Sequence, residues 1–466
     1  MARAIRSIGT FGACVFILGL GWLQAAEPAT DWKAGVARVD TTPTAPVWMS
    51  GYASRSSPSQ GVAHPLFAKA LALADARDNK VVIVTCDIIG FSRDFTGRVA
   101  ERVRDKYGLP RENLVLFASH CHSGPTPADS TDRLKSNGAV REQAQNNVDY
   151  TRDLENKIVD VVGDALGKME PASLDYCVGR AHFALNRREK TDKGIKLGKN
   201  PAGPTDESVP IVRVQSASGK PLAIIFGYAC HNTTHRPDML RIDPDYAGYA
   251  QDRIEADNPG TVALFVTGCA GDADPHPFGT LDMAKDHGQE LGEAVKFALA
   301  RPMMMITLTG PLRSAFTETT IHFAGPTDRD SYEKLLNDPN TNRKQHAQHM
   351  IETIDQGKPI RTEYPYAAQA FALGDKLTMV ALSGEVVVDY AIRLQKELGG
   401  EGRALWVAAY ANDVVGYIPS VRVLREGGYE AGESFYGSTF PAPFADDIES
   451  IVVKAAHDMV EKVRKE

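Results

Sequence analysis

The stretch LVLFASHCHSGP, residues 114–125, joins a buried strand to a group of reactive side chains. Residues 114–119 form a continuous apolar run, which is typical of a β-strand covered on both faces. Two histidines, His120 and His122, follow this run in a turn that also contains Gly124 and Pro125. We therefore expect an internal sheet with polar chemistry at the ends of its strands.

Continuous apolar runs like that at residues 114–119 recur along the chain. Five other runs predict buried strands, at residues 81–85, 223–229, 262–267, 377–382 and 405–409. Apolar side chains with helical spacing predict helices at residues 281–300 and 386–398. Two polar segments without strong strands, residues 126–157 and 325–367, are interpreted as insertions that form lids, helical excursions or surface loops. The predicted fold class is α/β, with mixed sheets and flanking helices.

Polar residues follow each of the other predicted strands. They are CD at 86–87, CHN at 230–232, GCAGDADPH at 268–276, SGE at 383–385 and YAND at 410–413. Ligands of α/β proteins bind beyond the carboxyl ends of the strands. We therefore expect these side chains to form one polar pocket rather than several unrelated loops.

The histidines and a carboxylate in this set predict a metal site. His120 and His122 lie on the same side of the chain if the strand pleat continues, so both could bind one metal ion, or one could bind it while the other transfers protons. His231 and Glu385 follow two other strands. Imidazole nitrogen and carboxylate oxygen are typical ligands of a catalytic zinc ion, so we predict a Zn2+ site.

The N-terminus has the pattern of a secretory signal. Arg3 and Arg6 precede an apolar stretch at residues 11–23, and the small residues Ala25 and Ala26 follow it. The stretch is too short for a typical membrane span. We expect a signal peptide at residues 1–26, export to the periplasm or the medium, and one catalytic domain at residues 30–466, with a retained anchor as the alternative.

Composition excludes some classes of partner. The formal net charge is −7 over 466 residues and no basic stripe is present, which argues against nucleic acid. No later stretch is long and apolar enough to cross a membrane. Five cysteines lie beyond the signal segment, and such an odd, scattered set does not indicate a disulfide framework.

Several ordered motifs resemble the catalytic domain of the neutral/alkaline (non-lysosomal) ceramidases. They are AGVARVD at 34–40 with MSGY at 49–52, HCHSGP at 120–125, NR at 186–187, GY at 416–417, and the segment 429–437. The resemblance extends from about residue 34 to about residue 437. It implies the ceramidase catalytic fold. Full-length ceramidases carry an additional C-terminal β-sandwich domain, and we expect this chain to lack it.

The resemblance also implies roles for individual residues. The zinc ligands of the family correspond to His120, His231, Glu385 and Tyr417. His122 would then orient a ligand or transfer protons, and Arg187 would contact the substrate or an oxyanion. The choice between His120 and His122 as the ligand stays open, because their spacing fits either assignment.

The chain departs from the family at the nucleophile. Ceramidases have a serine in a Gly-Asp-x-Ser-Pro motif, whereas this chain reads GDADP at 271–275 and has Asp274 at that position. A carboxylate is a poor nucleophile toward an amide. We expect Asp274 to act as a base toward a water molecule that the metal activates, or as a further metal ligand.

Three functional hypotheses follow. The leading one is a zinc-dependent hydrolase that cleaves an amide (N-acyl) bond in a small N-acylated lipid or amino sugar, with ceramide as the substrate of the family. The second is a hydrolase of a glycosidic or ester bond in a carbohydrate, in which Asp272 and Asp274, with Glu385 nearby, serve as acid and base. The third is a zinc or ligand-binding protein without catalysis.

Overall fold

The computed structural model describes residue 1 and residues 31–130, 141–326, 328–400, 402–437 and 440–465. The predicted signal segment, residues 1–26, therefore lies outside the described residues except for Met1.

The larger sheet of the described residues has nine strands. Its order is β11 (Val262–Thr267), β10 (Pro221–Tyr228), β9 (Ser208–Ser216), β5 (Glu170–Arg180), β1 (Trp32–Asp40), β2 (Phe67–Asp75), β3 (Lys80–Cys86) and β4 (Leu114–Ala118), with β13 (Ile306–Leu308) beside β5. The pairs β10–β11 and β3–β4 are parallel and the other pairs are antiparallel. The sheet is mixed, as predicted.

A smaller sheet contains β14 (Leu312–His322), β15 (Glu363–Leu373), β16 (Leu377–Leu382) and β18 (Ala404–Ala408), in this order. The pair β16–β18 is parallel. Three two-stranded sheets accompany it among the described residues: β12 (Ala273–Pro275) with β6 (Ala184–Asn186), β17 (Glu385–Val386) with β19 (Tyr417–Ile418), and β7 (Arg188–Thr191) with β8 (Gly194–Leu197).

The two large sheets pack face to face. Phe117 and Val266 of the larger sheet share one buried cluster with Phe371 and Met379 of the smaller sheet. Because apolar side chains fill the space between the sheets, both sheets need helices on their outer faces.

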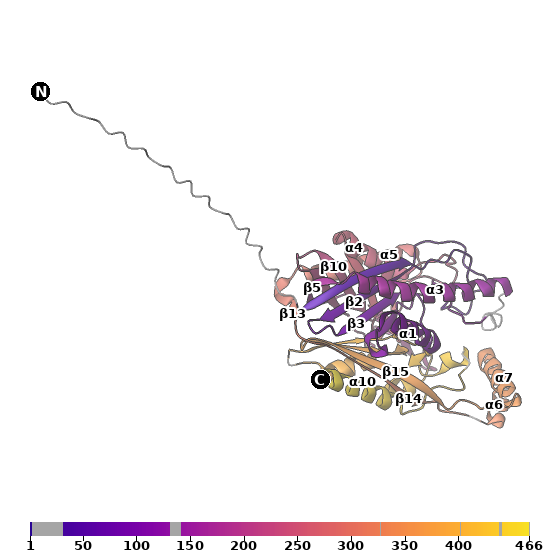
Figure 1. Cartoon of the computed structure of the whole chain (residues 1–466). Helices are drawn as coiled ribbons and strands as arrows, with labels where there is room; N and C mark the ends of the chain where they lie inside the picture. The colour runs from indigo at the N-terminus through magenta and orange to yellow at the C-terminus, as the bar shows by residue number, and fades with distance from the viewer. Residues whose placement is uncertain (2–30, 131–140, 327, 401, 438–439, 466) are drawn as a thin grey trace.

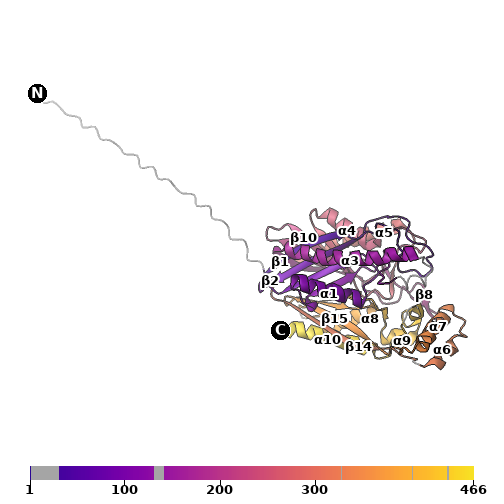
Figure 2. The same cartoon turned by 45° about the vertical axis from the view of Figure 1, so that its right-hand side comes forward.

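Helices cover those outer faces, which gives four layers in the order helix, sheet, sheet, helix (Figures 1 and 2). The larger sheet is covered by α3 (Arg141–Gly167), α4 (Asp245–Asp257) and α5 (Leu281–Leu299), and the smaller one by α8 (Val388–Leu398) and α10 (Ile448–Lys465). Figure 1 shows α4 and α5 at the top of the molecule and α10 at the bottom, with the sheets between them.

Local capping defines where α1 (Arg93–Tyr107) begins and ends. The hydroxyl of Ser92 accepts a hydrogen bond from the backbone N–H of Phe95, which satisfies one of the free donors of the first turn. Gly108 ends the helix with a left-handed φ of 68°, a conformation that costs a glycine little. Phe95, Val99 and Val103 form its buried face.

The sequence analysis predicted the strands that pair in parallel in the two large sheets. All six predicted strands are present as β3, β4, β10, β11, β16 and β18, and the two predicted helices are α5 and α8. Residues 325–367 contain α6 (Arg329–Leu335) and α7 (Thr341–Asp355), as the interpretation as a helical excursion allows, but the segment also contains the start of β15, which was not expected. The α/β class with mixed sheets is confirmed.

Two further expectations concern cysteines and membrane spans. The five described cysteines are free and buried, so they form no disulfide framework. Within the described ranges, no helix has the length and apolar character needed to cross a membrane.

Candidate metal centre and active site

The ends of strands from both large sheets converge on one site. His120 and His122 follow β4, His231 follows β10, and Glu385 follows β16 as the first residue of β17. An isolated bridge between Cys121 and Asn232 joins the two histidine segments. The strand β17 pairs in parallel with β19, and this register places Tyr417 opposite Glu385.

The side chains of the site approach one another through their nitrogen and oxygen atoms. The Nε2 atoms of His120 and His122 are 3.2 Å apart. One carboxylate oxygen, Oε2 of Glu385, lies 3.2 Å from Nε2 of His120 and 3.1 Å from Nε2 of His231. The ligand atoms of the three histidines all lie within 4.8 Å of one another. The hydroxyl of Tyr417 is 3.5 Å from Nε2 of His231.

Backbone carbonyl groups orient two of the three imidazoles. Nδ1 of His120 lies 2.6 Å from the carbonyl oxygen of Ile89, and Nδ1 of His231 lies 2.7 Å from that of Ala270. A carbonyl can only accept, so Nδ1 of each ring carries the proton and Nε2 presents its lone pair to the site. This is the arrangement in which proteins hold metal-binding histidines.

The pleat argument used for His120 and His122 is wrong, although its result holds. The strand ends at Ala118, and His120 adopts a left-handed φ of 60°, so the two side chains meet through a turn rather than along an extended strand. The Nε2 of His122 points into the same cluster as that of His120. The spacing of His120 and His122 therefore does not show which of the two would bind a metal ion.

Close packing fixes His122 on its outer side. A Cβ atom on Gly51 would lie 2.2 Å from Nδ1 of His122, and Gly51 has a φ of 91°, so this position requires glycine. The guanidinium of Arg55 donates a hydrogen bond of 2.5 Å to the carbonyl oxygen of His122. Nδ1 of His122 is buried and has no hydrogen-bond partner among the described residues.

Burial and neighbouring groups shift the pKa values of the site. Burial raises the pKa of Glu385, but its contacts with His120 and His231 outweigh burial and hold this pKa well below its usual range. Burial, with the adjacent imidazoles, lowers the pKa of His122 well below its usual value. Burial and Arg187 lower the pKa of His231. Neutral imidazoles beside a carboxylate are the protonation states that bind a cation.

Arg187 connects the cluster to Asp274. Its Nη1 donates to Oδ1 of Asp274 at 3.0 Å, and its Nη2 donates to the hydroxyl oxygen of Tyr417 at 2.9 Å. Its Nε donates to Oε1 of Glu430 at 2.8 Å. Because Nε, Nη1 and Nη2 all contact protein acceptors, Arg187 holds other side chains of the site in this state. The predicted contact of Arg187 with a substrate or an oxyanion stays a prediction.

Asp274 and Asp272 have different surroundings although they are two residues apart. The side chain of Asp274 is 36% exposed, and its Oδ1 also accepts a hydrogen bond of 3.3 Å from the hydroxyl of Thr233. Asp272 is fully buried, and its Oδ1 accepts a hydrogen bond of 2.8 Å from the backbone N–H of Val388 at the start of α8. In this structure Asp272 caps the first turn of α8, and burial raises the pKa of its carboxyl to about 6; its predicted role as an acid or base stays a prediction.

The sequence analysis missed Glu430 and Arg188, which are both buried beside Arg187. Glu430 accepts hydrogen bonds from both arginines, so it is part of the same network. Glu430 lies inside the segment 429–437 that resembles the ceramidases, but nothing in the spacing of that segment indicated a buried carboxylate. Only the adjacent pair Arg187-Arg188, which needs a counter-charge when buried, pointed to such a partner.

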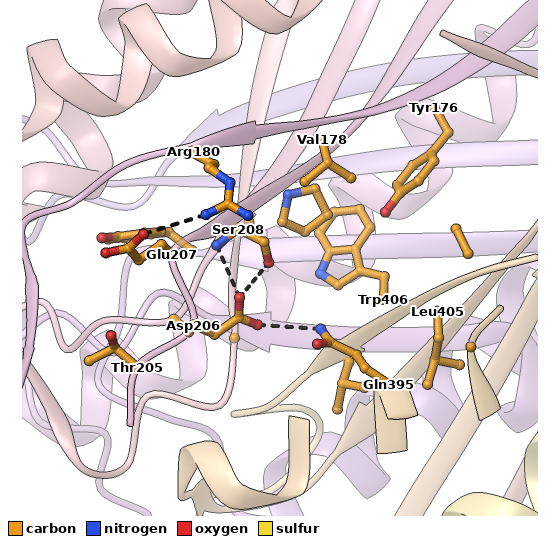
Figure 3. Close-up of a pocket in the computed structure, with 18 of the residues that line it drawn as sticks. Tyr176, Val178, Arg180, Thr205, Asp206, Glu207, Ser208, Gln395, Leu405 and Trp406 are labelled. Atoms are coloured by element: carbon orange, nitrogen blue, oxygen red, sulfur yellow. Dashed lines mark hydrogen bonds and ion pairs between the residues drawn. The ribbon is translucent and has the colours of Figure 1, made fainter. Parts of the chain in front are cut away.

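A separate cleft of about 530 Å³ opens between the two sheets (Figure 3). Tyr176, Val178 and Trp406 form its apolar wall, and none of the clustered histidines lines it. Asp206 in this cleft accepts hydrogen bonds from Ser208 and Gln395, as Figure 3 shows. Since the chemistry described above lies elsewhere, we place the candidate active site at the histidines.

Comparisons with known proteins identify the family and the fold. The sequence profile described as neutral/alkaline non-lysosomal ceramidase, N-terminal, matches residues 32–321. The chain belongs to this ceramidase family. The matched range includes His120, His122, His231 and Asp274, whereas Glu385 and Tyr417 lie beyond it.

Curated members of the family match over part of their length. The chain is 24% identical to neutral ceramidase B of Dictyostelium discoideum over 272 residues, which cover 54% of this chain and 36% of that protein. It is 34% identical to neutral ceramidase 2 of Arabidopsis thaliana over 113 residues, which cover 24% of this chain and 15% of that protein. The matched region thus spans well under half of these relatives.

A solved ceramidase structure has the same fold over most of this chain. The crystal structure of neutral ceramidase from Pseudomonas aeruginosa superposes with a TM-score of 0.71 and 21% sequence identity, covering 94% of this chain and 75% of that one. The catalytic-domain fold expected from the ceramidase resemblance is therefore confirmed.

Proposed function

We propose that this member of the ceramidase family is a zinc-dependent hydrolase that cleaves the amide bond of an N-acylated lipid, with ceramide as the first substrate to test. One observation carries the proposal: three imidazole nitrogens and the carboxylate of Glu385 meet at the ends of strands from both sheets. The relatives named as neutral ceramidases support the substrate class.

The donor set fits zinc. Nε2 of His120 and Nε2 of His231 both present lone pairs, and the Glu385 carboxylate lies between them at hydrogen-bond distance from each. Unprotonated nitrogens packed this closely repel one another unless a cation or a proton lies between them. His120, His231 and Glu385 would hold the ion, with His122 or Tyr417 completing the set.

The residues around the cluster suit amide hydrolysis. When bound, zinc polarises a carbonyl group and lowers the pKa of a water molecule. Asp274 is the accessible carboxylate of the site, and its Oδ2 has no hydrogen-bond partner among the described residues, so this oxygen can accept a proton from water. Arg187 holds the other oxygen of this carboxylate, because its Nη1 donates to Oδ1 of Asp274 at 3.0 Å. His122 is placed to transfer a proton to the departing amine.

The carbohydrate hypothesis depends on two carboxylates that have different surroundings in the structure. It needs Asp272 and Asp274 as an acid–base pair, but Asp272 caps α8 and is buried. An N-acyl amino sugar remains a substrate of the same reaction class, because its amide bond needs the same polarisation and the same base.

The test combines metal analysis with product release. We expect about one zinc ion per purified chain, fatty acid release from ceramide, and loss of this release on chelation with recovery on adding zinc. His231→Ala should lose both metal and activity, whereas His349→Ala, a change at an exposed histidine of α7, should retain both.

The other outcomes separate the hypotheses. Active protein that is free of transition metal would refute the zinc site. Acetate release from an N-acetylated amino sugar without fatty acid release would replace the lipid by a sugar substrate, and tight ligand binding without turnover would leave a binding protein.

A further inference from the structure

Glu430 is a buried carboxylate to which the chemistry above assigns no role. It lies four residues after the end of α9 (Val421–Glu426) and its side chain is 0% exposed. Its two oxygens accept from two different guanidinium groups: Oε1 from Nε of Arg187 at 2.8 Å, and Oε2 from Nη1 of Arg188 at 2.7 Å. Two adjacent buried cations therefore share one buried anion.

Arg187 transmits the position of Glu430 to the candidate site. The guanidinium is planar and its N–H groups have fixed directions, so a contact at Nε determines where Nη1 and Nη2 point. With Nε held by Glu430, Nη1 reaches Asp274 at 3.0 Å, and Nη2 reaches the hydroxyl of Tyr417 at 2.9 Å. Nη2 also donates to the carbonyl oxygen of Gly271 at 2.9 Å.

The surroundings leave Arg187 little room to turn. The rings of Tyr417 and Tyr429 lie 5.4 Å and 5.9 Å from the central carbon of the guanidinium. Arg188 anchors the other side of the network, because its Nη2 donates to the carbonyl oxygen of Gly427 at 2.8 Å. Glu430 is thus held between a fixed backbone segment and the arginine that contacts the site.

We propose that Glu430 is a positioning residue, which acts through Arg187 to hold Asp274 and Tyr417 in place beside the histidine cluster. This inference deepens the proposed function and relies on it for the part that concerns metal binding. A residue that fixes a metal ligand from outside typically contributes about tenfold to a hundredfold in metal affinity.

The test uses Glu430→Gln with Glu426→Gln as its matched control. Both changes remove one negative charge that contacts Arg188. Glu426, however, is 36% exposed, and among the described residues it pairs with Arg188 and Arg422 and not with Arg187. Zinc affinity is measured by competition with a chromophoric chelator, and crystal structures of both metal-free variants are determined. A purely structural role would change thermal stability and leave the zinc affinity of the folded protein unaltered.

Both oxygens of Glu430 accept from arginines, and Glu430→Gln replaces one of these acceptors by an NH2 donor, so the amide cannot hold both guanidinium groups. We therefore expect Glu430→Gln to weaken zinc binding about tenfold or more and Glu426→Gln to stay within about twofold of wild type. The crystal structures should show the contact between Arg187 and Tyr417 broken only in Glu430→Gln. An unchanged contact in that variant, or an unchanged zinc affinity, overturns the inference. If wild-type protein binds no zinc, the proposed function is refuted. In that case the Arg187–Tyr417 contact in the Glu430→Gln structure still tests whether Glu430 positions Arg187.

A second variant covers the case in which Glu430→Gln does not fold. Combining it with Arg188→Met removes one buried cation together with the buried anion and so keeps the network closer to neutral. The same loss of zinc affinity and of the Tyr417 contact is expected. A double variant that folds and keeps both the wild-type zinc affinity and the Arg187–Tyr417 contact would contradict the inference.

Discussion

At the scale of single residues, Asp274 occupies the position at which the ceramidase resemblance predicts a serine. If its carboxylate accepts a proton from water, Asp274→Asn should lower kcat by roughly 10² to 10⁴, the usual contribution of a general base. Zinc should stay bound, because the amide oxygen can still accept from Arg187. Asp286→Asn, an exposed change on α5, is the control for the loss of one charge.

The alternative outcomes at Asp274 are equally informative. Loss of zinc in Asp274→Asn would make Asp274 a metal ligand and leave His122 as the base. Asp274→Ser restores the residue found in the family's motif, so a gain of activity on ceramide would identify a ceramidase pocket with an exchanged nucleophile.

His64 allows a pH prediction away from the metal centre. Burial lowers the pKa of His64, but the hydrogen bonds to Asp252 and to the carbonyl of Pro65 outweigh burial and raise this pKa to about 9. The folded state therefore binds the proton more tightly than the unfolded state. Its contribution to stability is complete below about pH 6.5 and is lost as pH rises through about 9.

Urea unfolding of wild type and His64→Gln measures this contribution. The difference in free energy of unfolding should be about 1–2 kcal/mol near neutral pH, after allowance for solvent screening, and should vanish above the folded-state pKa. His457→Gln removes a surface imidazole that pairs with Glu397 and should change stability little. A difference that is constant with pH would show that the His64 charge contributes nothing.

At the scale of secondary structure elements, the segment that contains Asp274 also caps α8. Val387, at the N-cap of α8, supplies no side-chain cap, and Asp272 performs this function from another part of the chain. Asp272→Ala should lower the free energy of unfolding by about 1–2 kcal/mol, with zinc content and kcat per folded molecule retained. Asp328→Ala, which removes the exposed N-cap of α6, is the matched loss of one cap. Abolished turnover in folded Asp272→Ala would support a catalytic role.

The elements also show how far sequence reasoning extends. Strands β3, β4, β10, β11, β16 and β18 were predicted because continuous apolar runs distinguish them. β2, with the sequence FAKALALAD, and β5, with EPASLDYCVGR, lack that signal, since alanine is a helix former and polar residues interrupt β5. Their partners across the sheet determine their conformation. The site was predicted from side chains after strands, but Glu430 was not, because only the fold brings it to Arg187.

At the scale of the whole molecule, one apolar layer joins the two sheets, so they should unfold together. Phe371 of β15 is 1% exposed in this layer, and Phe371→Ala should cost about 3–5 kcal/mol. Phe297→Ala, at a position that is 61% exposed on α5, should change stability by less than about 0.5 kcal/mol. Tryptophan fluorescence includes the signal of Trp32 and Trp406 in the shared layer. The change in this fluorescence and the release of bound zinc should follow one transition. Two separated transitions would contradict a common core.

The division of the site between the two sheets has a consequence for biosynthesis. The three histidines follow strands of the larger sheet, whereas Glu385 and Tyr417 follow strands of the smaller one and come later in the chain. On the ribosome, the histidines therefore emerge well before their oxygen partners, and a nascent chain that stops short of Gly384 presents imidazoles alone. If the site binds zinc as proposed, specific metal loading is expected at the last stage of maturation, after the second sheet has docked. Truncated translation products should then bind the ion more weakly than the full chain.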